Sequence, residues 1–336
     1  MKYHPITDTI DLQASQRDIL DTHEFKSVYP TLSEYLDSFE QQGIPAKNDL
    51  KQLLNFLVTG LSNAKGTQSR FRNEAERFTL FCWREREKSV LDTKLEDIKL
   101  YIDWIWSPPK TLIADTTISS RFKYRPNSDI RVVNPEWRPF VHRTPKANRK
   151  IESLIAPGKA SSTKHAYKIS QTSLRNSYAS LNVFFKWLID AELVMRNYLA
   201  DAKKNCKYLI KVKIYQPPHT FDDEVWETFI QCLTVAADEN PKFEIHRFVV
   251  LSLKVLFLRI SELSSRDYYT PLFNHFRPDP SNEGWVLHVV GKGKKERVVT
   301  VPDSYIENVL GRYRESMDLA PLPRIDEDTP ILPSMK

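Results

Sequence analysis

The sequence predicts a mainly α-helical protein with a small β-sheet or hairpin in its second domain. Three observations support this fold class. Only 8 glycines occur in 336 residues, far below the average of about 7%, which favours long helices with few left-handed turns. Apolar residues recur at helical spacing along most of the chain. Two β-branched runs near the C-terminal end, Trp285–Val290 and Val298–Val301, predict the strands.

The length of the chain and its shifts in composition suggest four segments. At 336 residues, two domains are expected rather than one. The polar residues 1–27 predict an N-terminal arm, and residues 28–202 a helical domain that carries a basic insertion at 107–160. The lysine-rich residues 203–219 predict a linker, and residues 220–336 form the second domain.

Apolar stripes predict the helices of the first domain. They cover Leu32–Phe39, Leu50–Leu61, Thr67–Lys88, Leu95–Trp106 and Leu174–Ile189. Before the last of these helices, the polar run Ser161-Ser162-Thr163 predicts a helix cap.

The third of these helices has a basic face opposite its apolar stripe. Such a face can serve solubility alone, or it can follow DNA phosphates and supply affinity without sequence information. The basic residues of the face are Arg70, Arg72, Arg77, Arg84, Arg86 and Lys88. Of these, Arg70, Arg77 and Arg84 are our candidates for DNA contacts.

The insertion at 107–160 concentrates the charge of the protein. It holds 11 Lys and Arg against 4 Asp and Glu, a local charge of +7, whereas the whole chain carries +6. Seven of the 21 prolines lie here, which argues against regular helix. A solvated linker is one interpretation, but linkers seldom carry Trp and Phe. We therefore predict an ordered insertion that faces DNA. Its candidate contacts are Arg121, Lys123, Arg125, Arg131 and Arg138.

Arg259 stands in the long apolar run Ile245–Leu263. A helix that is apolar all round belongs in a core, and Lys254 and Arg259 interrupt it too early for a membrane span. A guanidinium in such a place must be paired or face a polar cleft. Glu262 and Asp267 are candidate partners, and the alternative is a forked donor that binds phosphate.

The two predicted strands are joined by a loop rich in glycine and lysine. Its sequence from residue 291 is Gly-Lys-Gly-Lys-Lys-Glu-Arg, so two of the eight glycines flank Lys292. Glycine at these positions indicates a sharp bend or a close approach to another group. Taken alone, a lysine-rich hairpin tip is usually a solvated turn.

The helix and the hairpin together resemble the tyrosine recombinase (phage integrase) family. The resemblance rests on Leu-Arg-Ile-Ser-Glu-Leu from residue 258 and on the Gly-Lys-Gly-Lys-Lys-Glu-Arg loop, with Arg259 and Lys292 separated by 33 positions. It implies that Arg259 is the first catalytic arginine and Lys292 the catalytic lysine. Neither a cofactor nor a metal is implied. Lys294, Lys295 and Arg297 are further candidates for DNA contacts.

The resemblance also implies the roles of the domains. Residues 28–202 would be an α-helical core-binding (SAM-like) domain, and residues 220–336 the first part of an α+β catalytic domain. The two would close on duplex DNA as a C-shaped clamp. The expected substrate is an attachment site with inverted repeats, bound by a dimer to tetramer. A complete enzyme of a mobile element would cut and rejoin strands through a 3′-phosphotyrosine.

The sequence after the hairpin departs from the family pattern. Only 34 residues follow Pro302, and they contain no His-x-x-Arg motif. Asp303–Met317 predicts one helix, whose Tyr305 and Tyr313 have the spacing of core residues rather than of a nucleophile. We therefore expect a C-terminally truncated chain, either a fragment or a naturally shortened integrase, that binds DNA without cleaving it.

Two other classes of protein compete with this interpretation. One is a non-catalytic DNA-binding regulator built on the same clamp, and the other is an unrelated helical RNA-binding or scaffold protein. The cysteines Cys82, Cys206 and Cys232 lack zinc-site spacing, and their odd number favours a reducing compartment. With no signal peptide or membrane span in the sequence, we expect a cytoplasmic, nucleoid-associated protein.

Overall fold

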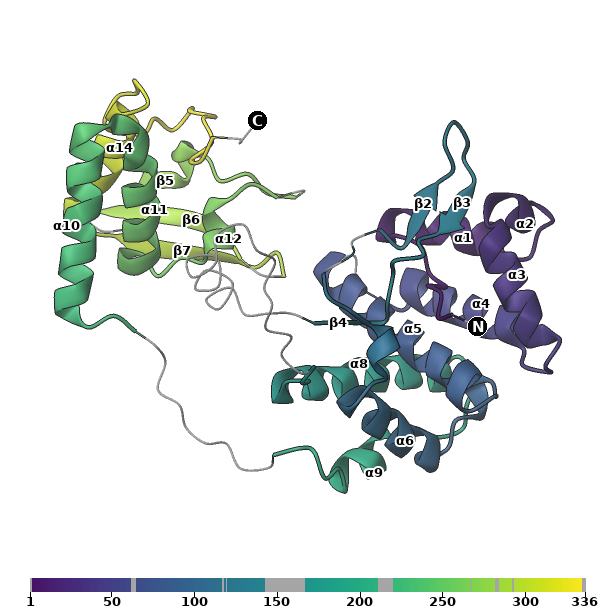
Figure 1. The fold of residues 1–336 in the computed structure, drawn as a ribbon. Helices are drawn as coiled ribbons and strands as arrows, with labels where there is room; N and C mark the ends of the chain where they lie inside the picture. The colour runs from purple at the N-terminus through teal and green to yellow at the C-terminus, as the bar shows by residue number, and fades with distance from the viewer. Residues whose placement is uncertain are drawn as a thin grey trace, which may run out of the picture. The chain divides into compact units, whose positions relative to one another are not determined.

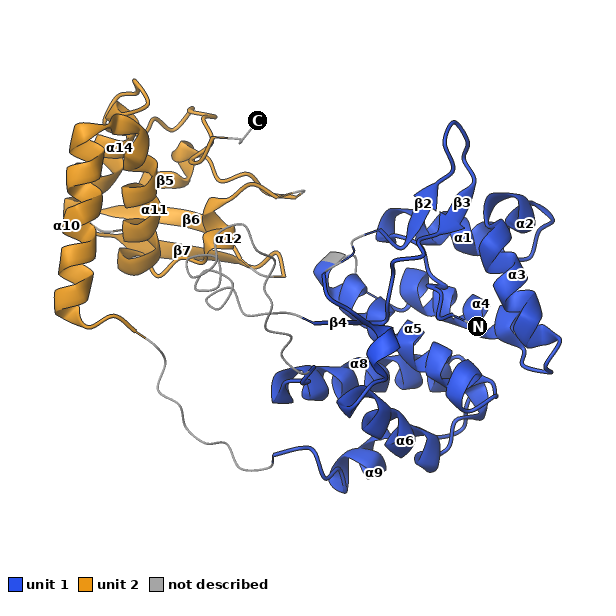
Figure 2. Ribbon diagram, viewed as in Figure 1, with its two compact units in different colours: residues 1–214 blue, residues 215–336 orange. Residues whose placement is uncertain are grey.

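The chain forms two compact units in the computed structural model. They comprise Met1–Ile214 and Tyr215–Lys336, so the boundary lies within the expected linker 203–219. Figure 2 colours the two units separately. The structure describes residues 2–61, 65–116, 118, 120–142, 167–210, 220–266, 268–281, 284–291 and 293–333.

The first unit is built from helices around one apolar core (Figure 1). The helices are α1 (Gln13–Ile19), α2 (Glu24–Val28), α3 (Pro30–Glu40), α4 (Ala46–Thr59), α5 (Lys65–Glu85), α6 (Leu95–Trp106), α8 (Gln171–Asp190) and α9 (Leu199–Lys204). The five helices that apolar spacing predicted are α3, α4, α5, α6 and α8, and their ends differ from the prediction by a few residues. A mainly helical fold is thus confirmed.

The N-terminal residues are part of the first unit rather than a separate arm. Ile6 and Thr7 are fully buried, and both backbone N–H groups donate to Glu76 Oε1 of α5, at 2.7 and 2.9 Å. Helix α1 packs against α4. The polar composition of residues 1–27 gave no sign of this burial. The buried polar groups of the segment are hydrogen-bonded by side chains that are distant in the sequence, such as the Glu76 carboxylate.

The described part of the insertion, residues 107–116, 118 and 120–142, contains four short strands. Strand β1 (Ile113–Ala114) pairs in parallel with β4 (Phe140–Val141), and β2 (Phe122–Tyr124) pairs antiparallel with β3 (Arg131–Val133). Phe122, Trp137 and Phe140 belong to the core of the unit. The rings therefore anchor the insertion, as their presence predicted. Residues 143–160 lie outside the described residues, as does the predicted cap at 161–163.

Helix α8 has a different cap from the one that the sequence suggested. Ser170 occupies the N-cap position in extended conformation. Its hydroxyl oxygen accepts the backbone N–H of Ser173 at 3.0 Å. This bond satisfies one of the donors left without a partner at a helix start.

The second unit combines helices with one antiparallel sheet. Its helices are α10 (Asp223–Glu239), α11 (Glu244–Val255), α12 (Ile260–Leu263), α13 (Asp303–Tyr305), the π-helical segment Ile306–Gly311 and α14 (Arg312–Glu315). Its strands are β5 (Phe276–Pro278), β6 (Trp285–Val290) and β7 (Glu296–Val301), in the order β5-β6-β7. Strands β6 and β7 form the predicted hairpin, with His288 opposite Val298. The short β5, which contains a proline, was not predicted.

The run Ile245–Leu263 is not one helix, contrary to the prediction. Helix α11 ends at Val255, and α12 begins at Ile260. Between them Phe257 has a left-handed backbone with φ 49°. No glycine or proline marks this break in the sequence. No helix among the described residues is long and apolar enough to cross a membrane.

The two tyrosines after the hairpin are core residues, as their spacing predicted. Each is 2% exposed. The Tyr305 hydroxyl lies 2.6 Å from Ser252 Oγ, and the Tyr313 hydroxyl donates to the carbonyl of Ile331 at 2.9 Å. Burial raises the pKa of Tyr313 to about 12.

Candidate nucleic-acid interface

Arg259 is the N-cap residue of α12, and Glu262 holds it from one side. Its backbone is extended, with φ −83° and ψ 145°. Nη1 donates to Glu262 Oε1 at 2.9 Å, and the backbone N–H donates to Glu262 Oε2 at 2.8 Å. The predicted pair with Glu262 is therefore present. Its side chain is nevertheless 65% exposed, so the rest of the guanidinium is open to a ligand.

Glu262 receives a third donor from the hairpin. Its side chain is fully buried, and Arg297 Nη2 at the start of β7 lies 2.8 Å from Oε2. Burial opposes ionisation of Glu262, but the hydrogen bonds from Arg297 and Arg259 outweigh it and lower its pKa. The carboxylate therefore stays ionised at neutral pH and fixes both arginines.

Arg297 has a different position from the exposed DNA contact that we expected. Besides its bond to Glu262, its Nη2 donates to the Phe257 carbonyl at 3.3 Å. The guanidinium of Arg297 is thus bound mainly by groups within the protein. Through these bonds Arg297 links the hairpin to the loop that carries Arg259. Sequence spacing gave no sign of this link, because Glu262 precedes Arg297 by 35 positions.

The loop that carries Lys292 starts beside Arg259. A Cβ atom placed on Gly291 would lie 2.9 Å from Glu262 Oε1 and 3.7 Å from Arg259 Nη1. A side chain at this position would therefore displace the carboxylate, which explains the glycine. Gly293 has φ 78°, where glycine is favoured. Lys292 itself lies outside the described residues.

Lys294 and Lys295, the other lysines of the loop, are exposed as expected. The Lys294 ammonium lies 5.5 Å from the centre of the Tyr268 ring. Tyr268, which sequence reasoning missed, accepts a hydrogen bond from Arg266 Nη1 at 2.5 Å. A partly exposed phenol between two cations thus adds to the polar surface near the hairpin.

Two of the expected DNA contacts in the insertion are buried, which corrects that prediction. Arg121 pairs with Glu76, and its Nε donates to the Thr7 carbonyl at 2.8 Å. Arg131 donates to both oxygens of Asp8, from Nε at 2.9 Å and from Nη2 at 2.5 Å. Both arginines bind the N-terminal segment instead of facing solvent.

The other candidates of the insertion lie at the surface. Lys123 and Arg125 are exposed at the β2–β3 hairpin, which projects from the first unit (Figure 1). The Lys123 ammonium lies 3.6 Å from Glu136, a pair exposed on both sides that adds little stability. Arg138 is partly exposed and donates to the carbonyls of Pro135 and Trp137.

Helix α5 and the residues just after it present a smaller basic surface than the sequence indicated. Arg86 and Lys88 both pair with Asp97, at 2.8 and 2.9 Å. Arg84 is half-buried, with its guanidinium 5.5 Å from the centre of the Tyr3 ring. Only Arg70 of the three candidate contacts on this helix is exposed.

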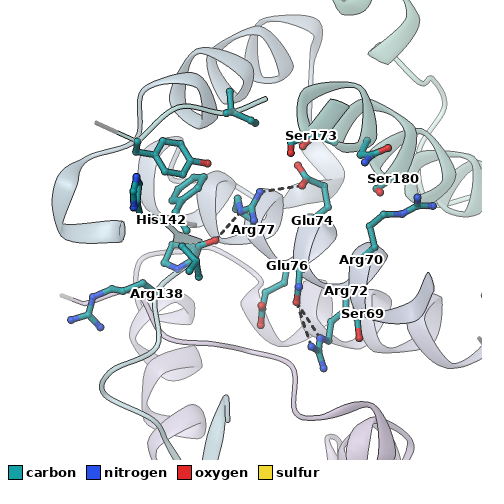
Figure 3. Close-up of a pocket in the computed structure, with 18 of the residues that line it drawn as sticks. Ser69, Arg70, Arg72, Glu74, Glu76, Arg77, Arg138, His142, Ser173 and Ser180 are labelled. Carbon is teal, nitrogen blue, oxygen red and sulfur yellow. Dashed lines mark hydrogen bonds and ion pairs between the residues drawn. The ribbon is translucent and has the colours of Figure 1, made fainter. Parts of the chain in front are cut away.

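A pocket of about 820 Å³ lies between α5, α8 and the insertion (Figure 3). Arg77 crosses it, donating to Glu74 Oε2 and to the Pro139 carbonyl, both at 3.1 Å. Arg72 Nη1 donates to the carbonyl of Asp8. The cationic side chains that line the pocket outnumber its two carboxylates. These cations are Arg70, Arg72, Arg77, Arg121, Arg138 and Lys168.

Fold and site together describe a mainly helical protein of two units, with an exposed arginine anchored beside a glycine–lysine hairpin. No protein-family model and no curated protein sequence matches the chain. Among solved structures the chain is similar to "XerH site-specific recombinase bound to difH substrate: pre-cleavage complex". The identity is 13% and the TM-score 0.34, over 83% of this chain and 71% of that chain.

Proposed function

We propose that this chain binds duplex DNA as a site-specific recombinase of the tyrosine recombinase type. The observation that carries the proposal is the position of Arg259. Glu262 anchors its guanidinium on one side, the other side is open, and the hairpin loop that contains Lys292 starts next to it. The resemblance pairs Arg259 in catalysis with Lys292, the residue that follows Gly291 in the chain.

The chemistry of the proposed site follows from the fixed guanidinium. A planar guanidinium with free N–H groups binds two oxygens of one phosphate, which an ammonium cannot do. Donors fixed before the reaction stabilise charge as it develops on the non-bridging oxygens. In a complete enzyme a tyrosine attacks the phosphodiester, a 3′-phosphotyrosine forms, and the 5′-oxygen leaves with a proton. The resemblance assigns that proton to Lys292.

Exposed cations of both units would supply most of the affinity for DNA. We assign phosphate contacts to the exposed Arg70, Lys123 and Arg125 and the partly exposed Arg138 of the first unit, and to Lys294 and Lys295 of the second. Such contacts position the duplex but carry no sequence information. By the resemblance, two to four copies would assemble on inverted repeats.

The buried tyrosines favour a second function. Tyr305 and Tyr313 are enclosed in the core and hydrogen-bonded, so neither can reach a phosphate in this fold. A DNA-binding regulator that uses the clamp without cleavage fits this observation. Both functions require binding to duplex DNA. They differ in whether Arg259 and Lys292 take part in strand cleavage.

A salt titration tests the binding that both functions require. If six phosphates are contacted, log K should fall against log salt with a slope of about −5, near −0.9 for each contact. Replacement of Lys123 and Arg125 by Gln should make the slope less negative by about 2. Arg324→Gln is the matched control, because Arg324 is also an exposed cation and pairs with Asp326. A slope near zero for the unaltered chain contradicts the proposal.

A further inference from the structure

Phe257 is the most exposed phenylalanine among the described residues. Its side chain is 83% exposed and its φ is 49°. A bulky residue is a genuine outlier at positive φ, because its Cβ approaches the backbone closely. Exposure of a large ring and a strained backbone each lower the stability of the isolated protein. Because both occur at Phe257, they indicate that the ring has a binding role.

The core holds this residue in place from both sides. Leu256 and Leu258 are 1% and 6% exposed and belong to the apolar core of the second unit. The Phe257 carbonyl accepts a hydrogen bond from Arg297 at 3.3 Å. Because its neighbours are anchored, the loop cannot relax by turning the ring inward. Strained conformations persist where the surroundings impose them in this way.

Phe257 and the proposed phosphate-binding residue Arg259 lie in the same short loop between α11 and α12. Phe257 precedes Arg259 by two positions, and two residues of chain span at most about 7 Å. Successive phosphates of one DNA strand are about 3.4 Å apart along the helix axis. The Cα atoms of Phe257 and Arg259 are therefore no farther apart than about two axial steps of one DNA strand. Ile260, the next residue after Arg259, is also 56% exposed.

We propose that Phe257 is an apolar wedge that enters the DNA base stack beside the phosphate held by Arg259. This inference rests on the proposed function. Phenylalanine and isoleucine side chains enter base steps from protein surfaces and partly unstack them, and a base can also stack on the free face of an aromatic ring. The hairpin whose Arg297 contacts the Phe257 carbonyl also carries the exposed cations Lys294 and Lys295, which favour DNA over an apolar protein surface as the partner.

The experiment compares Phe257→Gly and Phe257→Trp in the full chain. Glycine adopts positive φ without strain, so the midpoint of urea unfolding should not fall. Duplex affinity should fall by about tenfold, the scale of one lost base–aromatic contact. A 2-aminopurine base placed next to the bound phosphate should brighten with the unaltered chain and with Phe257→Trp, but not with Phe257→Gly. Ile325→Gly, at a loop residue that is 72% exposed, should change none of these readings.

Several results would overturn the wedge. One is unchanged affinity and unchanged 2-aminopurine fluorescence with Phe257→Gly, while the salt titration still shows binding. Another is a lower urea midpoint, which would make the ring a packing residue. Reduced self-association in sedimentation, with DNA binding intact, would assign the ring to contact with a second copy. Failure of the unaltered chain to bind duplex would instead remove the proposed function, and the wedge with it.

Discussion

Arg297 lies 2.8 Å from the buried carboxylate of Glu262, although 35 positions separate them in the sequence. This contact joins the β6–β7 hairpin to the start of α12, where Arg259 binds the other oxygen of the same carboxylate at 2.9 Å. One buried anion therefore sets the position of both cations. The arrangement makes Glu262 the residue whose loss should disturb the site most.

Glu262→Gln should destabilise the chain by about 2 kcal/mol at pH 7, because a neutral amide leaves two guanidiniums without their charged partner. The pKa of Glu262 is lower in the folded protein than its ordinary value of 4.5. Its contribution to stability is therefore present above pH 4.5 and is lost as the pH falls through the folded value. Urea unfolding at several pH values measures both effects. The variant should show a weaker pH dependence in this range, whereas Glu296→Gln, at an exposed position of β7, should resemble the unaltered chain.

The basic residues of the insertion should separate into two classes. Arg131→Gln should lower stability by about 3–5 kcal/mol, because it leaves the fully buried Asp8 without its charged partner. Lys123→Gln with Arg125→Gln should leave stability within about 0.5 kcal/mol, since both residues are exposed. Thermal unfolding and duplex binding, measured on the same preparations, distinguish the classes. Weaker DNA binding by folded Arg131→Gln, with stability unchanged, would contradict the structural role.

Substitutions of Arg259 and of Lys292 should have different effects on the rate of strand cleavage, in a protein that also carries the nucleophilic tyrosine. Arg259→Lys should slow strand cleavage on every substrate, because a point charge cannot replace a forked donor. Lys292→Ala should slow cleavage of ordinary DNA, and a 5′-thiolate leaving group should restore the rate, since it needs no proton. Cleavage rates measured for each variant on the two substrates distinguish these two roles. Rescue of Lys294→Ala or Lys295→Ala in place of Lys292→Ala would move the acid role to that lysine.

The 336 residues by themselves should bind DNA without cutting it. Tyr305 and Tyr313 are buried, and cleavage needs an activated tyrosine in line with the phosphate. A suicide substrate nicked near the scissile phosphate would trap any covalent adduct, which denaturing electrophoresis detects. No adduct is expected. An adduct that disappears with Tyr305→Phe or Tyr313→Phe would identify that residue as the nucleophile.

The sequence alone determined the regular elements and pointed to Arg259 and Lys292 as candidate residues. Apolar spacing predicted the main helices of the first unit, since burial of one helical face requires it. The β-branched runs predicted β6 and β7, and the glycines beside Lys292 predicted a close approach, which Gly291 makes to Glu262. These features are local, so neighbouring residues are enough to specify them.

Only the tertiary structure decided which charges face solvent. Arg131 and Arg125 occur in the same basic and aromatic stretch, yet Arg131 is buried because Asp8, 123 positions away, pairs with it. The break in the helix at Phe257 likewise depends on the core that receives Leu256 and Leu258. Contacts between residues far apart in the sequence determine which arginines are buried and where the helix breaks. The local composition around a residue does not reveal a partner at that distance.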